Sequence, residues 1–375
     1  HAPGLSGKEL NAYIAAGIYS DHECTTCQEA AEKLRLGMWI MLREGSAAKN
    51  LVALLPLVNN ANFRRCLFVT DDRHPKDLLQ EGHIDQILRK AVSLGLDPIR
   101  AVQMATINTA QRFGLKSLGA VAPGYIADLV IANNLKDFEV KAVFKDGRLI
   151  VEDGQLSVEI APYEDSAVLN TVNTAPLSLQ SFKIKVEAGQ AKVIELVPDQ
   201  IVTKKTVTRV KSQGGFVVSD VENDILKLAV IERHQATGNI GLGLVKGFGL
   251  NRGALASSVG HDSHNIIVVG TDDRDMLVAV EKIAALGGGY AAVWGGRVLA
   301  SLPLPIAGLM SDRSVQEVQG ALQQLHQAGE ELGAKPESPF ITLSFLALPV
   351  IPELKLTDKG LVDVMQFKKV PLWGE

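Results

Sequence analysis

Short apolar stretches alternate with helix-like segments through the first 116 residues, and this alternation restricts the fold more than any other feature. Strands are predicted at residues 17–22, 38–42 and 66–72, and helices at 6–16, 26–37, 47–55, 83–94 and 97–113. Strands and helices in this order form a parallel α/β sheet or barrel. Because a closed barrel needs eight strands, residues 1–116 are expected to be the second half of one, with its first half absent.

Two further regions follow the α/β part. Residues 117–160 are predicted to form a small flanking β-domain, with a hairpin that turns at Lys145-Asp146-Gly147. Residues 161–375 combine predicted strands with a long amphipathic helix at 314–332, which indicates an α+β domain. The predicted boundaries are therefore 1–116, 117–160 and 161–375.

Composition excludes several classes of protein. The 375 residues carry a net charge of −4 without a long basic run, which gives no support for nucleic-acid binding. No apolar run approaches the roughly 20 residues of a membrane-spanning helix, and no signal peptide is recognisable. Three cysteines, an odd number, argue against a disulfide framework and favour a reducing, cytoplasmic location.

Polar side chains gather at the ends of the predicted strands. His1 and His22 stand at loop or strand ends in successive α/β units, and Asp71 and Asp72 end the strand at 66–72. Chemistry in barrel enzymes sits at the C-terminal ends of the strands, so these side chains could meet in space. Two imidazoles and a carboxylate suit a divalent transition metal. The alternatives are hydrogen-bonded histidines without a ligand and a charged turn that caps a helix.

Several segments resemble one family. The segments are His1-Ala-Pro-Gly-Leu-Ser-Gly, Ser20-Asp-His-Glu23, Arg43-Glu-Gly-Ser46, Val69-Thr-Asp-Asp-Arg-His-Pro75, Gly82-His-Ile-Asp85, Asp97-Pro98, Met104-Ala-Thr106 with Asn108, Gly124-Tyr-Ile-Ala-Asp-Leu-Val130, Gly260-His-Asp-Ser-His-Asn265 and Leu343-Ser-Phe-Leu-Ala-Leu-Pro-Val350. Together they resemble bacterial adenine deaminases of the amidohydrolase superfamily. The resemblance covers essentially the whole chain.

The resemblance implies a metal-dependent (β/α)8 barrel, a small β-domain and an adenine-deaminase-type C-terminal α+β domain. It implies His1 as the metal ligand after strand 5, His22 as the ligand after strand 6, and Asp71 as the aspartate after strand 8. Asp72 is the alternative, because neighbouring residues of a strand point to opposite faces. The implied cofactor is a binuclear divalent metal centre of manganese or iron, with zinc as a further option. The His-x-His pair of the superfamily is absent from this chain, so the functional prediction concerns the intact protein.

The implied reaction is the hydrolysis of adenine to hypoxanthine and ammonia by a metal-activated water. Asp71 would take the proton from the water and deliver one to the leaving ammonia. Arg43, Glu44, Ser46 and Asp72 are the predicted contacts to the purine, and a helix cap at Ser46 with a surface ion pair is the alternative for the first three. The expected assembly is a homodimer. Alternative functions are another cyclic-amide or amino hydrolase of the superfamily, and a catalytically dead barrel that serves as an interaction module.

Four other motifs carry weaker signals. Cys24-Thr-Thr-Cys27 lacks the surrounding signature of zinc nucleobase deaminases and is interpreted as incidental. His83 is expected to be structural. His261 and His264 could bind a metal, but a hydrogen-bonded turn is the commoner explanation. Gly287-Gly288-Gly289 lacks the Lys-Ser/Thr of a phosphate-binding loop.

Overall fold

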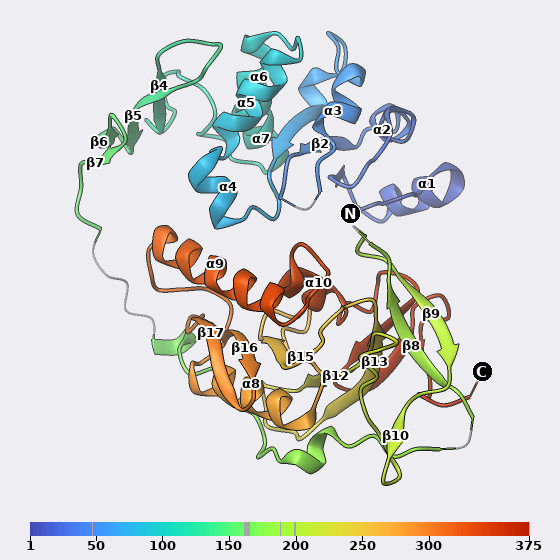
Figure 1. The fold of residues 1–375 in the computed structure, drawn as a ribbon. Helices are drawn as coiled ribbons and strands as arrows, with labels where there is room; N and C mark the ends of the chain where they lie inside the picture. Colours follow the sequence, from blue (N-terminus) through green and yellow to red (C-terminus); the bar gives the residue numbers. More distant parts are fainter. Residues whose placement is uncertain (47, 161–165, 188, 199, 375) are drawn as a thin grey trace. The chain divides into compact units, whose positions relative to one another are not determined.

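The computed structural model describes residues 1–375 except 47, 161–165, 188, 199 and 375. The chain divides into two compact units, His1–Pro162 and Tyr163–Glu375 (Figure 1). Residues 117–160, predicted as a domain of their own, lie within the first unit. Among the described residues, no helix combines the length and the apolar character needed to cross a membrane.

The first unit is built on a parallel sheet of the strands β1 (Ser20–Asp21), β2 (Trp39–Arg43) and β3 (Cys66–Val69), in that order. Its helices are α1 (Gly7–Ala15), α2 (Cys27–Arg35), α3 (Leu51–Leu54), α4 (Pro75–Gln80), α5 (Ile84–Ser93), α6 (Pro98–Ala105) and α7 (Ile107–Arg112), with short 3-10 turns at Leu55–Leu57 and Phe63–Arg65. The predicted α/β alternation is therefore confirmed for this unit.

The core of the first unit lies between the sheet and its helices. Ile40 and Leu42 of β2 and Phe68 of β3 are at most 3% exposed and pack with Ile87 of α5 and Met104 of α6. The apolar residues of these strands are buried on both faces, as is typical of parallel strands covered by helices.

Two predicted helices differ from the structure. The predicted helix at 97–113 is divided at Thr106, whose φ of −124° and ψ of −91° are not helical. The Thr106 hydroxyl donates to the carbonyl of Val102 at 2.7 Å. The Asn108 side chain donates to the carbonyls of Phe63 and Cys66 and thereby anchors α7 beside β3. The predicted helix at 47–55 is shorter as well, because α3 starts only at Leu51, after Asn50.

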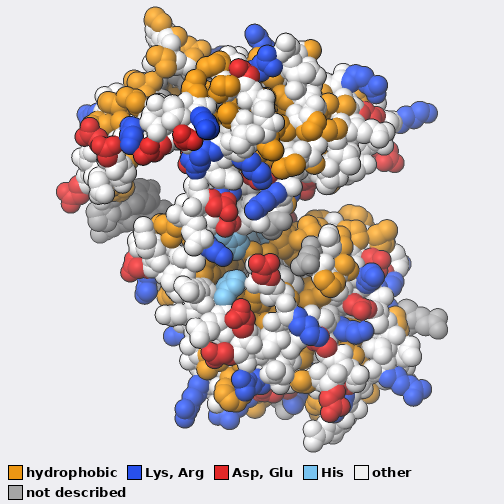
Figure 2. Space-filling view, turned by 45° about the horizontal axis from the view of Figure 1, so that its top comes forward, with side chains coloured by type: hydrophobic (Ala, Val, Ile, Leu, Met, Phe, Trp, Pro, Cys, Tyr) orange, Lys and Arg blue, Asp and Glu red, His pale blue; other side chains and the backbone are white. Residues whose placement is uncertain are grey.

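A four-stranded antiparallel sheet completes the first unit. Its strands are β4 (Leu129–Ala132), β5 (Val140–Lys145), β6 (Arg148–Glu152) and β7 (Gln155–Leu156). The predicted hairpin turns at Asp146 and Gly147, both of which have positive φ, as a type I′ turn requires. This sheet exposes apolar side chains, among them Val130 at 64% and Ile131 at 52%, and hydrophobic side chains are visible on the molecular surface (Figure 2).

The second unit contains an eight-stranded sheet in the order β17-β16-β14-β15-β12-β13-β8-β9. These strands are β8 (Ala191–Leu196), β9 (Thr203–Thr208), β12 (Ile225–Ile231), β13 (Ile240–Lys246), β14 (Ala254–Ser257), β15 (Ile266–Gly270), β16 (Gly289–Trp294) and β17 (Arg297–Pro303). All neighbouring strands run antiparallel except β13 and β8, which are parallel.

Three helices cover the two faces of this sheet (Figure 1). Leu228 and Val230 of β12 belong to the core formed with α9 (Val315–Glu331) and α10 (Pro339–Phe345). Ala229 and Ile231 belong to the opposite core, formed with α8 (Asp273–Ala285). Successive strand residues point to opposite faces, so the apolar residues of β12 supply both cores.

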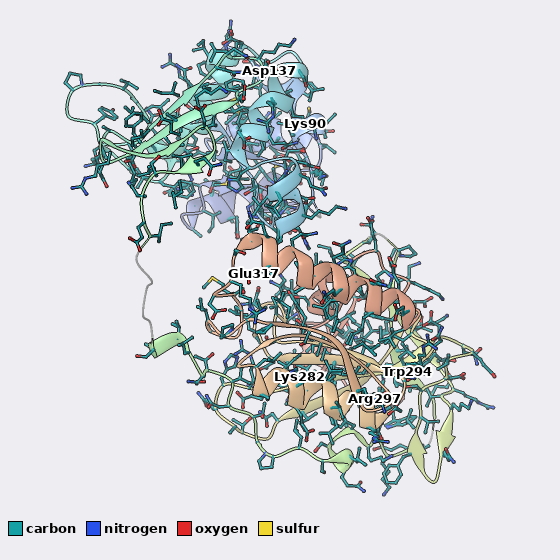
Figure 3. All side chains as sticks on the ribbon, turned by 60° about the vertical axis from the view of Figure 1, so that its left-hand side comes forward. Lys90, Asp137, Lys282, Trp294, Arg297 and Glu317 are labelled. Atoms are coloured by element: carbon teal, nitrogen blue, oxygen red, sulfur yellow. The ribbon has the colours of Figure 1, made fainter. Side chains whose placement is uncertain are left out.

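Capping residues fix the ends of the two longer helices. The Asp272 side chain accepts from the backbone of Arg274 and Asp275 at the start of α8. Ser314 and Glu317 form a reciprocal capping box at the start of α9, where Figure 3 labels Glu317.

Smaller elements complete the second unit. They are β10 (Ser212–Gln213), β11 (Phe216–Val217), β18 (Leu354–Thr357), β19 (Gly360–Asp363), β20 (Lys368–Lys369) and the 3-10 turns Ser166–Val168 and Leu179–Phe182. Within β18, Lys355 is 0% exposed, and its ammonium donates to the carbonyl of Ile201 at 2.9 Å. Burial without a nearby carboxylate lowers the pKa of Lys355 to about 8.

Replacing Lys355 tests this burial through the pH dependence of stability. The unfolded chain holds the proton up to about pH 10.4, whereas the folded chain releases it near pH 8. The free energy of unfolding should therefore rise with pH between these values. In Lys355→Met this contribution is absent, so the variant should be more stable relative to the wild type at pH 7 than at pH 10. Denaturant titrations at both pH values, with exposed Lys359→Met as the control, measure the difference. An equal difference at both pH values would contradict the assignment.

Candidate metal centre

The residues that follow the parallel strands meet at one edge of the three-stranded sheet. The rings of His1 and His22 lie with their centroids 4.7 Å apart, edge to face. His22 Nε2 is 3.5 Å from Asp71 Oδ2. The structure thus brings together the three residues that the sequence analysis selected as metal ligands.

Glu23, which was not among the predicted ligands, joins this group. Its Oε2 lies 3.0 Å from His1 Nδ1. Among the described residues, one ligand atom each from His1, His22 and Glu23 lie within 4.8 Å of one another. The sequence signal was the adjacency of Glu23 to His22, but strand alternation would turn neighbours apart. Because β1 ends at Asp21, both residues lie beyond the strand and can face the same side.

The donor set fits a divalent transition metal. The grouped donors are two imidazoles and the Glu23 carboxylate, and the Asp71 carboxylate lies beside His22. Iron, manganese and zinc accept both types of ligand. The His22 side chain is 19% exposed and that of Asp71 is 42% exposed. Solvent and a small substrate can therefore reach the carboxylate that a metal would share.

Asp71 and Asp72 have different surroundings. Asp71 has a φ of +56°, and its carboxylate accepts from the guanidinium of Arg43 on the neighbouring strand. Asp72 lies against the loop after β2: a Cβ placed on Gly45 would come 2.8 Å from its Oδ1, and the amide of Ser46 donates to its carbonyl at 2.7 Å. Asp71 lies beside His22, with its Oδ2 3.5 Å from the histidine Nε2.

Of the predicted substrate contacts, Arg43 contacts Asp71 of the candidate metal centre, whereas Glu44 and Ser46 bind residues of neighbouring helices. Arg43 points to Asp71, and its Nε is buried without a hydrogen-bond partner. Glu44 is 1% exposed, and its Oε2 lies 2.5 Å from the ammonium of Lys90 on α5, while its Oε1 is buried without a partner. The Ser46 hydroxyl donates to Asp77 of α4 and accepts from the backbone of His74. The helix-cap interpretation of Ser46 is wrong, because Asn50 precedes α3.

The cysteine motif has separate partners. Cys24 Sγ donates to Asp21 Oδ2 at 3.1 Å, whereas Cys27 Sγ donates to the carbonyl of Ala53 at 3.0 Å, and both thiols are free. Burial and the neighbouring Asp21 carboxylate raise the pKa of Cys24, which disfavours the thiolate that zinc binds. The two thiols thus make separate hydrogen bonds, which indicates a structural role for Cys24 and Cys27.

The side chains of His83 and His261 have hydrogen-bond or stacking partners. His83 Nε2 lies 3.1 Å from the Thr70 hydroxyl. In the second unit, His261 Nδ1 lies 3.0 Å from Asp262 Oδ1, and its ring stacks on Phe345. Among the described residues, His261 and His264 belong to no group of three potential metal ligands.

Comparison with known proteins gives two family matches along the chain. Residues 1–150 match the amidohydrolase family, and residues 200–368 match the adenine deaminase C-terminal domain. Solved structures are only distantly similar: the β-aspartyl dipeptidase of Fervidobacterium islandicum AW-1 has 21% identity and a TM-score of 0.30, over 36% of this chain and 37% of its own.

Curated relatives match nearly the whole chain. Adenine deaminase 2 of Carboxydothermus hydrogenoformans is 54% identical over 99% of the chain. The adenine deaminases of Dehalococcoides mccartyi and Desulfatibacillum aliphaticivorans are 50% and 54% identical over 99% and 100% of it. In each case the chain spans 65% of the relative's length. Both family matches and these relatives make the chain similar, along nearly its whole length, to adenine deaminases of the amidohydrolase family.

Proposed function

We propose that the full-length protein hydrolyses adenine to hypoxanthine and ammonia. The observation that supports this most directly is the meeting of His1, His22 and Asp71 at one edge of the parallel sheet. The proposal includes β1, β2 and β3 as later strands of a (β/α)8 barrel, and a homodimer as the assembly. Another hydrolase of the superfamily or a non-catalytic module is not favoured, because curated relatives that match nearly the whole chain are adenine deaminases.

The amidohydrolase family implies a divalent metal cofactor. We propose that His1, His22 and Asp71 hold it, with Glu23 as a further carboxylate. A binuclear centre of manganese or iron is our proposal, with zinc as the alternative. When bound, such a centre lowers the pKa of a water to about 7, so that hydroxide is available at neutral pH.

Asp71 is the proposed proton carrier. Its carboxylate would accept a proton from the attacking water and return one to the leaving ammonia. The contact with Arg43 supports this role, because the guanidinium on the adjacent strand fixes the direction of the carboxylate. The exposure of Asp71 supports it as well, since the group must reach the substrate.

The proposed substrate contacts are Arg43, Glu44, Ser46 and Asp72. Ring nitrogens and the amino group of a purine need donors and acceptors. The Nε of Arg43 is buried without a hydrogen-bond partner and is therefore a donor that could bind a purine nitrogen. Glu44 and Ser46 already bind Lys90 and Asp77. With these partners, Glu44 and Ser46 would support catalysis by holding the loop after β2 in place. To contact the purine directly, they would have to break these hydrogen bonds.

Replacing Asp71 with Asn tests the proton transfer. The amide is the same size but cannot carry the proton, so ammonia release from adenine should fall by about 10²–10⁴-fold. The fold and most of the metal should be retained. Steady-state ammonia release and the bound metal content measure the two effects. Asp137→Asn, on an exposed turn of the same unit (Figure 3), serves as the control. Near-normal turnover in Asp71→Asn would refute the role.

Replacing His22 with Ala tests the metal ligand. Losing a direct ligand should weaken metal binding by more than the roughly 10–100-fold that an outer-shell partner costs. Metal content after dialysis and competition with a chelator would show it. His326→Ala, on α9 of the second unit, is the matched control and should leave binding unchanged. Unaltered metal in His22→Ala would mean that the ligand assignment is wrong.

Replacing Lys90 with Met tests whether Glu44 stabilises the fold through Lys90 or contacts the purine. The variant leaves a buried carboxylate without its cation, so the free energy of unfolding should fall by about 1–3 kcal/mol. The double variant Glu44→Gln/Lys90→Met should recover part of this loss. Denaturant titration gives the stability, and KM for adenine gives the binding. If Glu44→Gln raised KM tenfold without a change in stability, Glu44 would be a substrate contact instead.

A further inference from the structure

One buried carboxylate connects the two segments that carry the histidines of the candidate metal centre. Asp21 is the last residue of β1, is 0% exposed and directly precedes His22. Its Oδ1 accepts from the amides of Ala2 at 3.0 Å and Glu23 at 3.1 Å. A single oxygen atom therefore holds the residues that follow His1 and His22, although the two segments are about twenty residues apart in the chain.

The second oxygen of Asp21 is held by a buried lysine. Lys33 of α2 is 0% exposed, and its ammonium lies 2.8 Å from Asp21 Oδ2, 2.6 Å from Glu29 Oε1 and 2.6 Å from the Ala2 carbonyl. An ammonium has three donors, and all three have an acceptor here. Asp21, Cys24 and Glu29 also form a group that could hold a metal ion. The Lys33 ammonium, which lies 3.6 Å from Cys24 Sγ, already supplies a cation to that group.

Two carboxylates of α2 also accept hydrogen bonds from amides of the N-terminal segment. Glu29 Oε1 accepts from the amide of Gly4 at 3.0 Å, and Glu32 Oε1 accepts from the amide of Gly7 at 2.9 Å. The residues between His1 and α1 have no regular secondary structure. Their position is therefore set by carboxylates of α2 and by Asp21.

We propose that Asp21, anchored by Lys33, is a positioning residue that sets the approach of His1 to His22 and so builds the metal centre. The inference rests on the proposed function only in that His1 and His22 are taken as ligands. Two buried charges cost desolvation free energy that their attraction offsets only when the geometry is well satisfied. Here every donor of Lys33 and both oxygens of Asp21 are used, and the contacts converge on Ala2, Glu23 and the strand end before His22.

The test compares Asp21→Asn with Asp21→Ala in the full-length protein. Mn²⁺ affinity is measured by competition with a chelator, and the visible spectrum of the Co²⁺-loaded protein reports ligand geometry. Asp21→Asn keeps Oδ1 as the acceptor for both amides, but it loses the charge and replaces Oδ2, which accepts from Lys33 and Cys24, with an amide nitrogen that cannot accept. Mn²⁺ affinity should fall modestly in this variant and by about 10–100-fold in Asp21→Ala. The Co²⁺ spectrum should change in the same order.

A matched control separates positioning from general stability. Lys227, 2% exposed on β12, forms a similar buried pair with Asp273 in the second unit. Lys227→Met should lower stability but leave Mn²⁺ affinity and the Co²⁺ spectrum unchanged. If it weakened Mn²⁺ binding as much as Asp21→Asn at an equal loss of stability, the positioning role would be overturned.

The remaining outcomes are distinct. Wild-type affinity and spectrum in both Asp21 variants, with binding lost in His22→Ala, would overturn the positioning role while leaving the metal centre in place. Unchanged binding in His22→Ala would instead refute the metal centre itself. Should Asp21→Ala fail to fold, the spectrum and affinity of Asp21→Asn decide the question alone. Adenine deamination is not needed for any of these readings.

Discussion

Parallel pairing of three short strands is the constraint on which the candidate site depends. Parallel strands present their C-terminal ends at one edge of a sheet. The register pairs Asp21 with Ile40, and Arg43 with Val69. The residues that follow β1 and β3 consequently lie at the edge to which Arg43 belongs. If the middle strand β2 ran antiparallel to its neighbours, Arg43 would lie at the opposite edge of the sheet and could not contact Asp71.

Charged side chains hold the N-terminal segment, which pairs with none of the three short parallel strands. The N-terminal segment before α1 has no sheet or helix partner for its amides, and buried amides need acceptors. Side chains supply them: Asp21 for Ala2, and Glu29 for Gly4. Buried carboxylates need a cation in turn, which Lys33 provides. In the same way, Lys90 of α5 pairs with the buried Glu44, which directly follows β2.

The sequence predicted those parts of the site that depend on local pattern. Strand-end positions selected His1, His22 and Asp71, because apolar runs mark strands and their ends. Glu23 and Asp21 could not be assigned in this way, since their directions depend on where β1 ends and on what α2 brings to it. Lys33 lies among charged residues of an amphipathic helix, and only the tertiary contact shows it buried. The break at Thr106 likewise depends on distant carbonyls that Asn108 binds.

The choice between the adjacent aspartates shows why strand periodicity was insufficient. Alternation along a strand would send Asp71 and Asp72 to opposite faces, but β3 ends at Val69, before either residue. What separates them is backbone conformation: Asp71 adopts a left-handed φ of +56°, which aspartate tolerates better than most residues. The following residue is then packed against Gly45, where no Cβ could fit beside the carbonyl of Thr70 at 2.7 Å. A glycine on one strand end thus permits the turn that points the neighbouring strand's carboxylate at His22.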